Sequence, residues 1–336
     1  MVIPGLWKRL PEWTRDYENF PALPVLARTI WLAKHREPLA GSLEEAAAGL
    51  FGLESLPAGA LLSKHYGLEP GERQALCADP VHLQADIDRL YLHPGDTLGI
   101  RQDEADRLVA EFNAHFQDEK LVLQAPAPSR WILCLPNEEQ LDTLPPSRLW
   151  GEDVRPQMPH GPRARYWGGI LTEIQMLFHQ SEVNSARRMR GAPEINSLWL
   201  WGCGRLPERI DPGVSEVFSD DVLVKALAEQ AGIRGLDEPE TLDDLLDQSE
   251  TGATPLVTLP LLAPAAAEDD LHAWQAGAEI LERDWLAPLL DALKTKRFAA
   301  AVLHTLDGPD LELSRQPFWR GWGSPPPWAR LVGGEA

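Results

Sequence analysis

The segment Asn196-Ser-Leu-Trp-Leu-Trp-Gly-Cys-Gly204 decides the predicted fold, because an apolar run leads directly into a glycine turn. An unbroken apolar run of this length is typical of a strand buried on both faces, as in a parallel sheet. Ligands of open α/β sheets bind beyond the carboxyl ends of the strands. Gly202 and Gly204 follow such an end, where a missing side chain lets a ligand approach the backbone closely. The segment therefore predicts a core strand over 197–201 that leads into a binding site.

The sequence on either side alternates between helix and strand patterns. After residue 151 we expect helices over 165–179, 220–230, 241–247 and 269–290, and strands over 216–219, 256–259, 298–304 and 311–314. Before residue 77 we expect a strand over 1–3, ended by Pro4-Gly5, and helices over 21–33, 43–50 and 60–66. Ser42 with Glu45 predicts a capping box for the second of these helices, and Thr241 caps the helix over 241–247. This alternation favours a mostly parallel sheet covered by helices on both faces.

The middle of the chain has a different pattern. Strands are expected over 81–86, 89–93, 121–124 and 130–135, with an amphipathic helix over 103–116 between the two pairs. This β-β-α-β-β order predicts a small α+β unit that ends at Leu144-Pro145-Pro146. We therefore expect an inserted domain over 77–150 and a core made of 1–76 and 151–336. In that core, the strand over 1–3 should lie beside the strand over 197–201.

Composition limits the class of protein. The 336 residues are 44% hydrophobic and 24% charged, as in an ordinary globular protein. Because 51 acidic residues oppose 31 basic ones, the net charge of −20 disfavours nucleic acid and anionic membrane surfaces as partners. The three cysteines form no Cys-x-x-Cys pair, and neither a signal peptide nor a stretch long enough to span a bilayer is visible. We expect a cytoplasmic protein that can bind a small anion only through a local basic pocket.

Such a pocket has candidates in a group of arginines. Guanidinium groups match the geometry of phosphate and carboxylate groups. The alternative is that these arginines form ion pairs with the acidic residues over 237–247. For the group as a whole we favour these ion pairs. For Arg187 alone we favour anion binding. The group consists of Arg163, Arg165, Arg187, Arg188 and Arg190.

Other polar residues carry weaker signals. His82 is a candidate ligand or acid/base, although a lone histidine in a strand is more often structural. Asp220-Asp221 can hold a metal, but Asp220 or Ser219 is better explained as the cap of the next helix. The sequence contains no G-x-G-x-x-G, no phosphate-binding loop, no H-E-x-x-H and no G-x-S-x-G. The residues alone therefore define no catalytic site.

The spacing Asn184-x-x-Arg187-x-x-x-Gly191-x-x-x-x-Asn196-x-x-Trp199-Leu-Trp-Gly-x-Gly204 resembles the core signature of archaeal-type, cofactor-independent phosphoglycerate mutases. That family belongs to the alkaline phosphatase superfamily, whose α/β fold carries a small inserted domain. The sequence is also similar to bacterial RpfE-type regulatory proteins. The motifs that carry this second similarity are Ala-Asp-Pro-Val-His-Leu (78–83), His-Pro-Gly-Asp-Thr-Leu (93–98), Phe-Asn-x-His-Phe (112–116) and Pro-Ser-Arg-Trp (128–131).

The resemblance implies an alkaline phosphatase-like, doubly wound, mostly parallel α/β sheet with a small inserted α+β domain. It also implies a ligand-binding surface, made of Asn184, Arg187, Asn196, Gly202, Gly204, Asp79 and His82.

The departures from the family pattern concern its two metal ions, which need several carboxylates and imidazoles. The first ligand is an Asp in an Asp-Gly pair, and here that place holds Pro4-Gly5. The nucleophilic Ser-Asp pair aligns with Pro57-Ala58, and the His-Pro-Val-Asn motif has become 181–184, Ser-Glu-Val-Asn. After residue 205 the only histidines are His272 and His304, so the late Asp-His and Gly-His motifs have no counterpart.

We therefore expect a degenerate phosphoglycerate mutase-like protein with no catalytic residues, no metal and no cofactor. It would act as a regulatory or binding protein for a small phosphorylated or carboxylate ligand, or for a protein partner. One alternative is an active, metal-dependent mutase or phosphatase. Another is a structural subunit that uses its tryptophan-rich tail, with Trp319 and Trp322.

Overall fold

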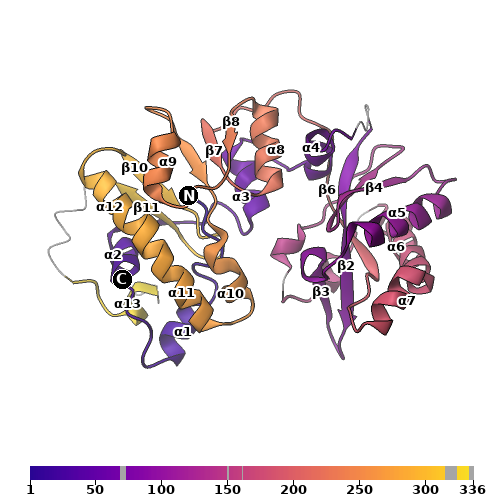
Figure 1. The fold of residues 1–336 in the computed structure, drawn as a ribbon, viewed down its shortest axis with the longest axis horizontal. Coiled ribbons are helices and arrows are strands. Elements are labelled where there is room, and N and C mark those ends of the chain that lie inside the picture. Colours follow the sequence, from indigo (N-terminus) through magenta and orange to yellow (C-terminus); the bar gives the residue numbers. More distant parts are fainter. Residues whose placement is uncertain (69–72, 150, 161, 315–323, 333–336) are drawn as a thin grey trace. The chain divides into compact units, whose positions relative to one another are not determined.

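The computed structural model describes residues 1–68, 73–149, 151–160, 162–314 and 324–332 (Figure 1). Trp319 and Trp322 of the tail lie outside these residues. The chain divides into two compact units. The terminal unit comprises Met1–Gly52 and Asp211–Ala336, and the central unit comprises Leu53–Ile210. No helix of the described residues is both long enough and apolar enough to cross a membrane.

The terminal unit contains two three-stranded sheets that residues 1–3 connect. In the parallel sheet the strand order is β8 (Arg234–Leu236), β7 (Glu216–Phe218), β9 (Pro255–Val257). In the antiparallel sheet it is β1 (Lys34–Arg36), β11 (Asp310–Ser314), β10 (Ala300–Leu303). Val2 makes parallel bridges to Thr258 and to His304, so it lies between β9 and β10. The expected strand over 1–3 is thus reduced to one bridging position, and it does not lie beside residues 197–201.

Helices surround these sheets in the terminal unit. They are α1 (Leu10–Asp16), α2 (Pro24–Leu32), α3 (Leu43–Leu50), α8 (Val222–Ala231), α9 (Leu242–Gln248), α10 (Ala263–Ala267), α11 (Leu271–Leu281), α12 (Ala287–Lys294) and α13 (Trp328–Val332). A 3₁₀ turn, Pro260–Leu262, precedes α10, and a π-helical turn, Glu282–Leu286, joins α11 to α12. The helix expected over 269–290 is therefore two α-helices with a π turn between them.

Local capping explains where several of these helices begin. The Ser42 hydroxyl accepts the Glu45 N–H at the start of α3, and the Thr241 hydroxyl accepts the Asp244 N–H at the start of α9, as predicted. At α8 the cap is Asp221, whose Oδ1 accepts the N–H groups of Leu223 and Val224. The expected cap at Asp220 or Ser219 was therefore misplaced by one or two residues.

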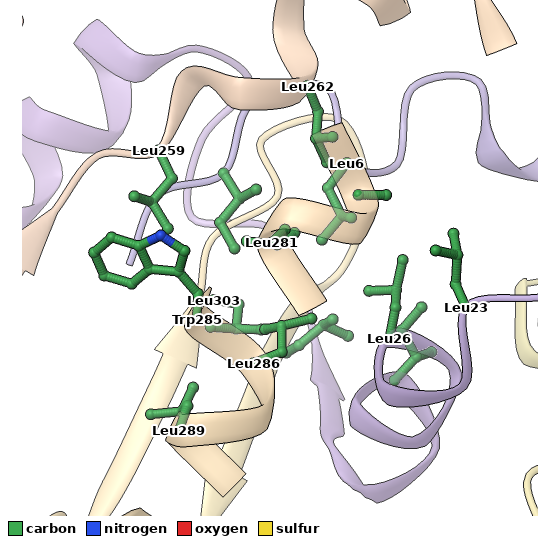
Figure 2. Packing of buried hydrophobic residues seen from close by; sticks show 14 of the residues in the cluster. Leu6, Leu23, Leu26, Leu259, Leu262, Leu281, Trp285, Leu286, Leu289 and Leu303 are labelled. Atoms are coloured by element: carbon green, nitrogen blue, oxygen red, sulfur yellow. The ribbon is translucent and has the colours of Figure 1, made fainter. Parts of the chain in front are cut away.

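The core of the terminal unit consists of aliphatic side chains and tryptophans from both ends of the chain (Figure 2). Leu6 and Leu26 come from the first segment, and Leu262, Leu281 and Leu303 come from the last; all five are completely buried. Apolar burial on this scale is the main favourable term in folding. It joins residues 1–52 to 211–332 in one unit.

The central unit contains one antiparallel sheet. Its strands are β2 (Ala75–Ala85), β3 (Leu90–Pro94), β4 (Val122–Ala127), β5 (Arg130–Cys134) and β6 (Ser197–Gly204), in the order β3-β2-β5-β4 with β6 paired to β2. Short 3₁₀ turns follow β3 at Gly95–Thr97 and occur at Pro146–Arg148 and Arg155–Gln157. The helices of this unit are α4 (Ala58–His65), α5 (Gln102–His115), α6 (Ala164–Gln180) and α7 (Glu182–Met189). Side chains of α5 and α6 share a hydrophobic cluster with the sheet.

Two expectations about the fold need correction. The sheets are small and mostly antiparallel, with parallel pairing at β7, β8, β9 and Val2, so a doubly wound, mostly parallel sheet is too strong a description. The strand over 197–201 pairs antiparallel with residues 77–81 of β2. Because packing buries β6 over Ser197–Trp201, its sequence reads as a continuous apolar run although its partner is antiparallel.

The pairing of β6 with β2 also changes the division of the chain. The β-β-α-β-β order expected between residues 77 and 150 is present as β2, β3, α5, β4 and β5. However, the compact unit runs from residue 53 to residue 210, because it also includes α4, α6, α7 and β6.

Candidate functional site

All seven residues predicted to bind a ligand lie in the central unit, and the first of them, Asn184, links backbone segments. Its Nδ2 donates to the carbonyl oxygens of Phe178 and Ile195, each at 2.8 Å, and its Oδ1 accepts the Ile195 N–H at 2.9 Å. The side chain is completely buried. Asn184 therefore joins the end of α6 to the segment before β6, which favours a structural role.

Arg187 is also completely buried, and each of its three guanidinium nitrogens donates to a protein oxygen. Nη1 donates to Glu104 Oε2 at 2.9 Å, Nε donates to the Pro193 carbonyl at 2.7 Å, and Nη2 donates to the Leu98 carbonyl. The other Glu104 oxygen accepts from Arg190 at 2.6 Å. Burial opposes ionisation of Glu104, but the bonds from the Arg101 N–H and from the two arginines hold its pKa below the usual value.

Four of the five arginines in the group form ion pairs, with three different acidic residues. Arg187 and Arg190 pair with Glu104, Arg188 pairs with Glu194, and Arg163 pairs with Glu139. None of these acids belongs to the run over 237–247. The alternative correctly predicted that arginines of this group form ion pairs, but it named the wrong acidic partners.

Asn196 extends the pairing between β6 and β2 by one residue. Its Oδ1 accepts the Leu83 N–H at 2.7 Å and its Nδ2 donates to the Leu83 carbonyl at 2.9 Å. Asn196 also lines a cavity of about 510 Å³ together with Thr172, Met176 and His179. It is the one predicted ligand-binding residue on the lining of that cavity.

The glycine turn serves packing within the central unit. Gly202 has φ +62°, and a Cβ there would lie 2.6 Å from the Ala58 Cβ. A Cβ on Gly204 would lie 2.6 Å from the Pro57 Cβ. The two glycines thus let β6 approach the first residues of α4, which is where the family resemblance aligns the nucleophile. The space expected for a ligand is filled by Pro57 and Ala58.

Asp79 lies in a buried polar group that the sequence did not reveal. Its Oδ2 accepts from Arg130 Nη1 at 2.5 Å and from Trp201 Nε1 at 2.8 Å. Burial raises the pKa of Asp79, while Arg130 acts in the opposite direction. Arg130 occurs in the Pro-Ser-Arg-Trp motif over 128–131, so that motif was the available signal for this partner.

His82 lies opposite His93 in the hairpin of β2 and β3. Its Nδ1 is 2.9 Å from the Glu194 carbonyl oxygen, which explains its orientation. The centroids of the two imidazole rings are 5.9 Å apart. The pKa of His93 is lowered mainly by burial and to a smaller extent by the charge of His82. These contacts again favour a structural role for His82.

A second candidate location is the carboxyl edge of the parallel strands in the terminal unit, where metal-dependent relatives would hold their ions. Ser219 follows β7 and Thr258 follows β9; their buried hydroxyls are 2.7 Å apart and bond to each other. Asp220 is largely exposed, and it accepts the Glu238 N–H at 3.2 Å. After β10, His304 Nδ1 is 2.7 Å from Asp310 Oδ2.

The first turn after Val2 closes this edge. Gly5 has φ +79°, and a Cβ there would lie 2.8 Å from backbone atoms of Leu262 and Ala263. Leu6, Leu259 and Leu262 are completely buried at the same place (Figure 2). The edge is therefore packed with hydrocarbon instead of carboxylates.

The polar residues that do occur here fit a pair of divalent ions poorly. Among the described residues, no group of three or more His, Cys, Asp or Glu side chains is placed to hold a metal ion. Asp307 is bonded to the Trp7 N–H at 3.1 Å, and burial raises its pKa to about 6. Because a carboxyl group must lose its proton to bind a metal, a proton competes with a metal for Asp307 more than for an ordinary carboxyl.

Comparisons with known proteins give a distant relationship. No family model matches the chain. The 2,3-bisphosphoglycerate-independent phosphoglycerate mutase of Methanosarcina acetivorans is 25% identical over 111 residues, and that of Methanosarcina mazei is 23% identical over 111 residues. Each match covers 32% of this chain and 28% of the relative. The chain is thus a distant relative of these archaeal mutases, which belong to the alkaline phosphatase superfamily. The resemblance to RpfE-type proteins finds no support here.

Among solved structures, the PH0037 protein from Pyrococcus horikoshii is similar with a TM-score of 0.52 and 17% identity, over 93% of this chain and 87% of that chain. The cofactor-independent phosphoglycerate mutase from Thermoplasma acidophilum is similar with a TM-score of 0.42 and 14% identity, over 94% of this chain and 89% of that chain. The likeness to the PH0037 protein shows a shared α/β fold.

Proposed function

We propose that this chain is a phosphoglycerate mutase-like protein that carries out no metal-dependent phosphoryl transfer and acts instead as a binding or regulatory protein. The observation that carries the proposal is the packing of Gly5 against Leu262 and Ala263 at the carboxyl edge of the strands. Two divalent ions need several charged or imidazole ligands. Ions placed among buried leucines would lose their hydration without gaining such ligands, which costs many kcal/mol.

The start of α4 supports the same proposal from the central unit. Pro57 and Ala58 offer no hydroxyl or thiol where the resemblance aligns the nucleophile. The nearest hydroxyl along α4, that of Ser63, is buried and donates to the Gly59 carbonyl at 2.7 Å. A serine nucleophile needs an activating base or metal beside it, and Ser63 instead satisfies its own helix.

The regulatory role is the finer part of the proposal. It rests on the motifs over 78–83, 93–98, 112–116 and 128–131, which resemble RpfE-type regulatory proteins. In this chain the first and last of these motifs meet, because Asp79 accepts from Arg130. These two motifs therefore hold β2 and β5 of the central unit together, and a binding protein would keep them for that reason.

The test combines metal content with activity. We expect the purified full chain, dialysed after incubation with Mn²⁺, Zn²⁺ or Mg²⁺, to hold well below one equivalent of metal by elemental analysis. We also expect no interconversion of 3-phosphoglycerate and 2-phosphoglycerate above background, beside an archaeal mutase as the positive control. Stoichiometric metal together with turnover that a chelator abolishes would overturn the proposal and establish the active mutase as the alternative.

A further inference from the structure

The terminal unit contains a cavity of about 520 Å³ at the amino ends of β9 and β10. This volume is in the range of small-molecule sites in proteins, roughly 300–1,000 Å³. Its lining also includes Val257, Val302 and His304, so the cavity extends along both strands. It is lined by β9, by β10 and the turn before it, and by side chains of α9 and α12.

Residues 1–3 bond to both strands that line the cavity. Val2 donates to the Val257 carbonyl at 2.8 Å, and Ile3 donates to the His304 carbonyl at 2.9 Å. These bonds place residues 1–3 beside the carboxyl ends of β9 and β10. Toward the amino ends, Pro255 of β9 and Ala300 of β10 both line the cavity.

The walls are mostly apolar. Leu242 and Leu245 contribute from α9, Leu289 from α12, and Phe298 from the turn before β10. His304 also lines the cavity, and burial lowers its pKa, so its ring is a neutral polar group at neutral pH. A ligand with an apolar body would fit these walls, because each buried methylene group gains about 0.8 kcal/mol.

Arg297 is the one arginine or lysine among the residues that line this cavity. Arg297 lines it and has an exposed side chain. No acidic side chain within the described part of the chain forms an ion pair with Arg297, whereas Arg9, Arg15, Arg36, Arg234 and Arg283 of the same unit are all paired. Arg330 of the same unit also has no ion pair among the described residues, so what distinguishes Arg297 is its place on the lining of a mostly apolar cavity. Its guanidinium group matches a carboxylate.

We propose that this cavity binds an apolar monocarboxylate, with the hydrocarbon part between α9, α12 and β10 and the carboxylate on Arg297. This site would supply the ligand of the binding protein proposed above. It is separate from the edge where the metal ions of relatives would lie. Binding is measured directly, so a failure here leaves the proposal about metal chemistry untouched, and an active mutase could still hold such a ligand.

The experiment is calorimetric titration of the full chain with hexanoate, octanoate and decanoate below their micellar concentrations. The affinity should rise about fourfold for each added methylene until the cavity is full. Decanol, which keeps the chain and lacks the charge, should bind more weakly than decanoate. Equal affinity for all chain lengths, or no saturable binding by any of them, would overturn the proposal.

Variants then test the two parts of the site. Arg297→Gln should lower the decanoate affinity about threefold to tenfold and leave decanol unchanged, because an exposed charge pair is screened by water. Arg297→Lys should keep most of the affinity, and Arg15→Ala, which removes a cation elsewhere in the unit, should have no effect.

The cavity itself is tested by its volume. Ala253→Phe adds a ring at the lining and should abolish binding, with circular dichroism to confirm that the variant is folded. Leu289→Ala enlarges the cavity and should shift the best chain length upward, which serves if the first variant fails to fold. Binding that none of these substitutions changes would place the ligand elsewhere and contradict the proposal.

Discussion

Arg187 and Glu104 form an ion pair of 2.9 Å between α7 and α5, with both side chains at most 4% exposed. A buried pair of this kind is held by its own hydrogen bonds as much as by charge. Arg187 is the centre of the motif that relates this chain to the archaeal mutases. In this structure its guanidinium group forms hydrogen bonds within the central unit. Each of its three nitrogens already donates to a protein oxygen, so few donors are left for a ligand.

Arg187→Ala should therefore lower the free energy of unfolding by about 3 kcal/mol or more, because it leaves the Glu104 carboxylate with only Arg190 and the Arg101 N–H and removes the donors to the Pro193 and Leu98 carbonyls. Urea denaturation followed by circular dichroism measures this loss. Arg188→Ala is the control, since its pair with Glu194 is partly exposed and should contribute under 1 kcal/mol. An unchanged stability with weakened binding of a phosphorylated acid would restore the functional reading of Arg187.

Gly202→Ala should destabilise the central unit by roughly 2 kcal/mol or more, because a side chain at φ +62° is strained and its Cβ would clash with Ala58. Gly168→Ala is the matched control within the same unit. It lies in α6 with open space around its Cα, so the substitution should stabilise by about 0.5–1 kcal/mol through helix propensity. Equal effects of the two substitutions in thermal denaturation would show that the approach of β6 to α4 is looser than described.

Leu262→Ala tests the packing that closes the strand edge in the terminal unit. Leu262 is completely buried, so the loss of its side chain should cost about 2–5 kcal/mol of unfolding free energy. Its neighbour Leu261 is 36% exposed, and Leu261→Ala should cost well under half as much. Chemical denaturation of both variants measures their free energies of unfolding. A small loss of stability in Leu262→Ala would mean that the edge is not closed by hydrocarbon.

Asp307 should make the terminal unit less stable as the pH rises. Its pKa in the folded chain is raised by burial to about 6, above the ordinary value of 3.8, so the folded state binds more protons than the unfolded state between these values. The stability contribution of the neutral carboxyl is complete below pH about 4 and declines as the pH rises through about 6.

Asp307→Asn should flatten this decline between pH 4 and about 7 while the amide oxygen can still accept the Trp7 N–H. Thermal melts across this pH range measure the effect. Asp247→Asn, at an exposed position of α9, should keep the wild-type profile. A steeper decline in Asp307→Asn than in the wild type would contradict the assigned direction of the shift.

Much of the local structure could be predicted because its causes are local. The amphipathic pattern over 103–116 corresponds to α5, and Ser42 and Thr241 cap the helices predicted for them. A cap bonds to an N–H two or three residues away, so sequence spacing contains the interaction. The same reasoning placed the cap of α8 at the wrong residue, since Ser219, Asp220 and Asp221 all have side chains that can cap.

The partners of β6 and of Arg187 could not be predicted in this way. Whether Ser197–Trp201 pairs parallel in one unit or antiparallel with β2 depends on residues more than a hundred positions away, and both arrangements bury the same run. Likewise, a guanidinium group looks the same in sequence whether it faces a ligand or a buried Glu104.

The sequence by itself determined most of the helices, the caps at Ser42 and Thr241, and the presence of proline at positions 4 and 57, because each of these depends on residue type and short spacing. Only the tertiary structure decided the role of the motif residues. Long-range packing brought Pro57 and Ala58 against the glycine turn and Leu262 against Gly5, and it enclosed Arg187 with Glu104. Burial is a property of the folded chain as a whole, and it brings Asn184 and Arg187 into hydrogen bonds with the protein's own carbonyl and carboxylate oxygens.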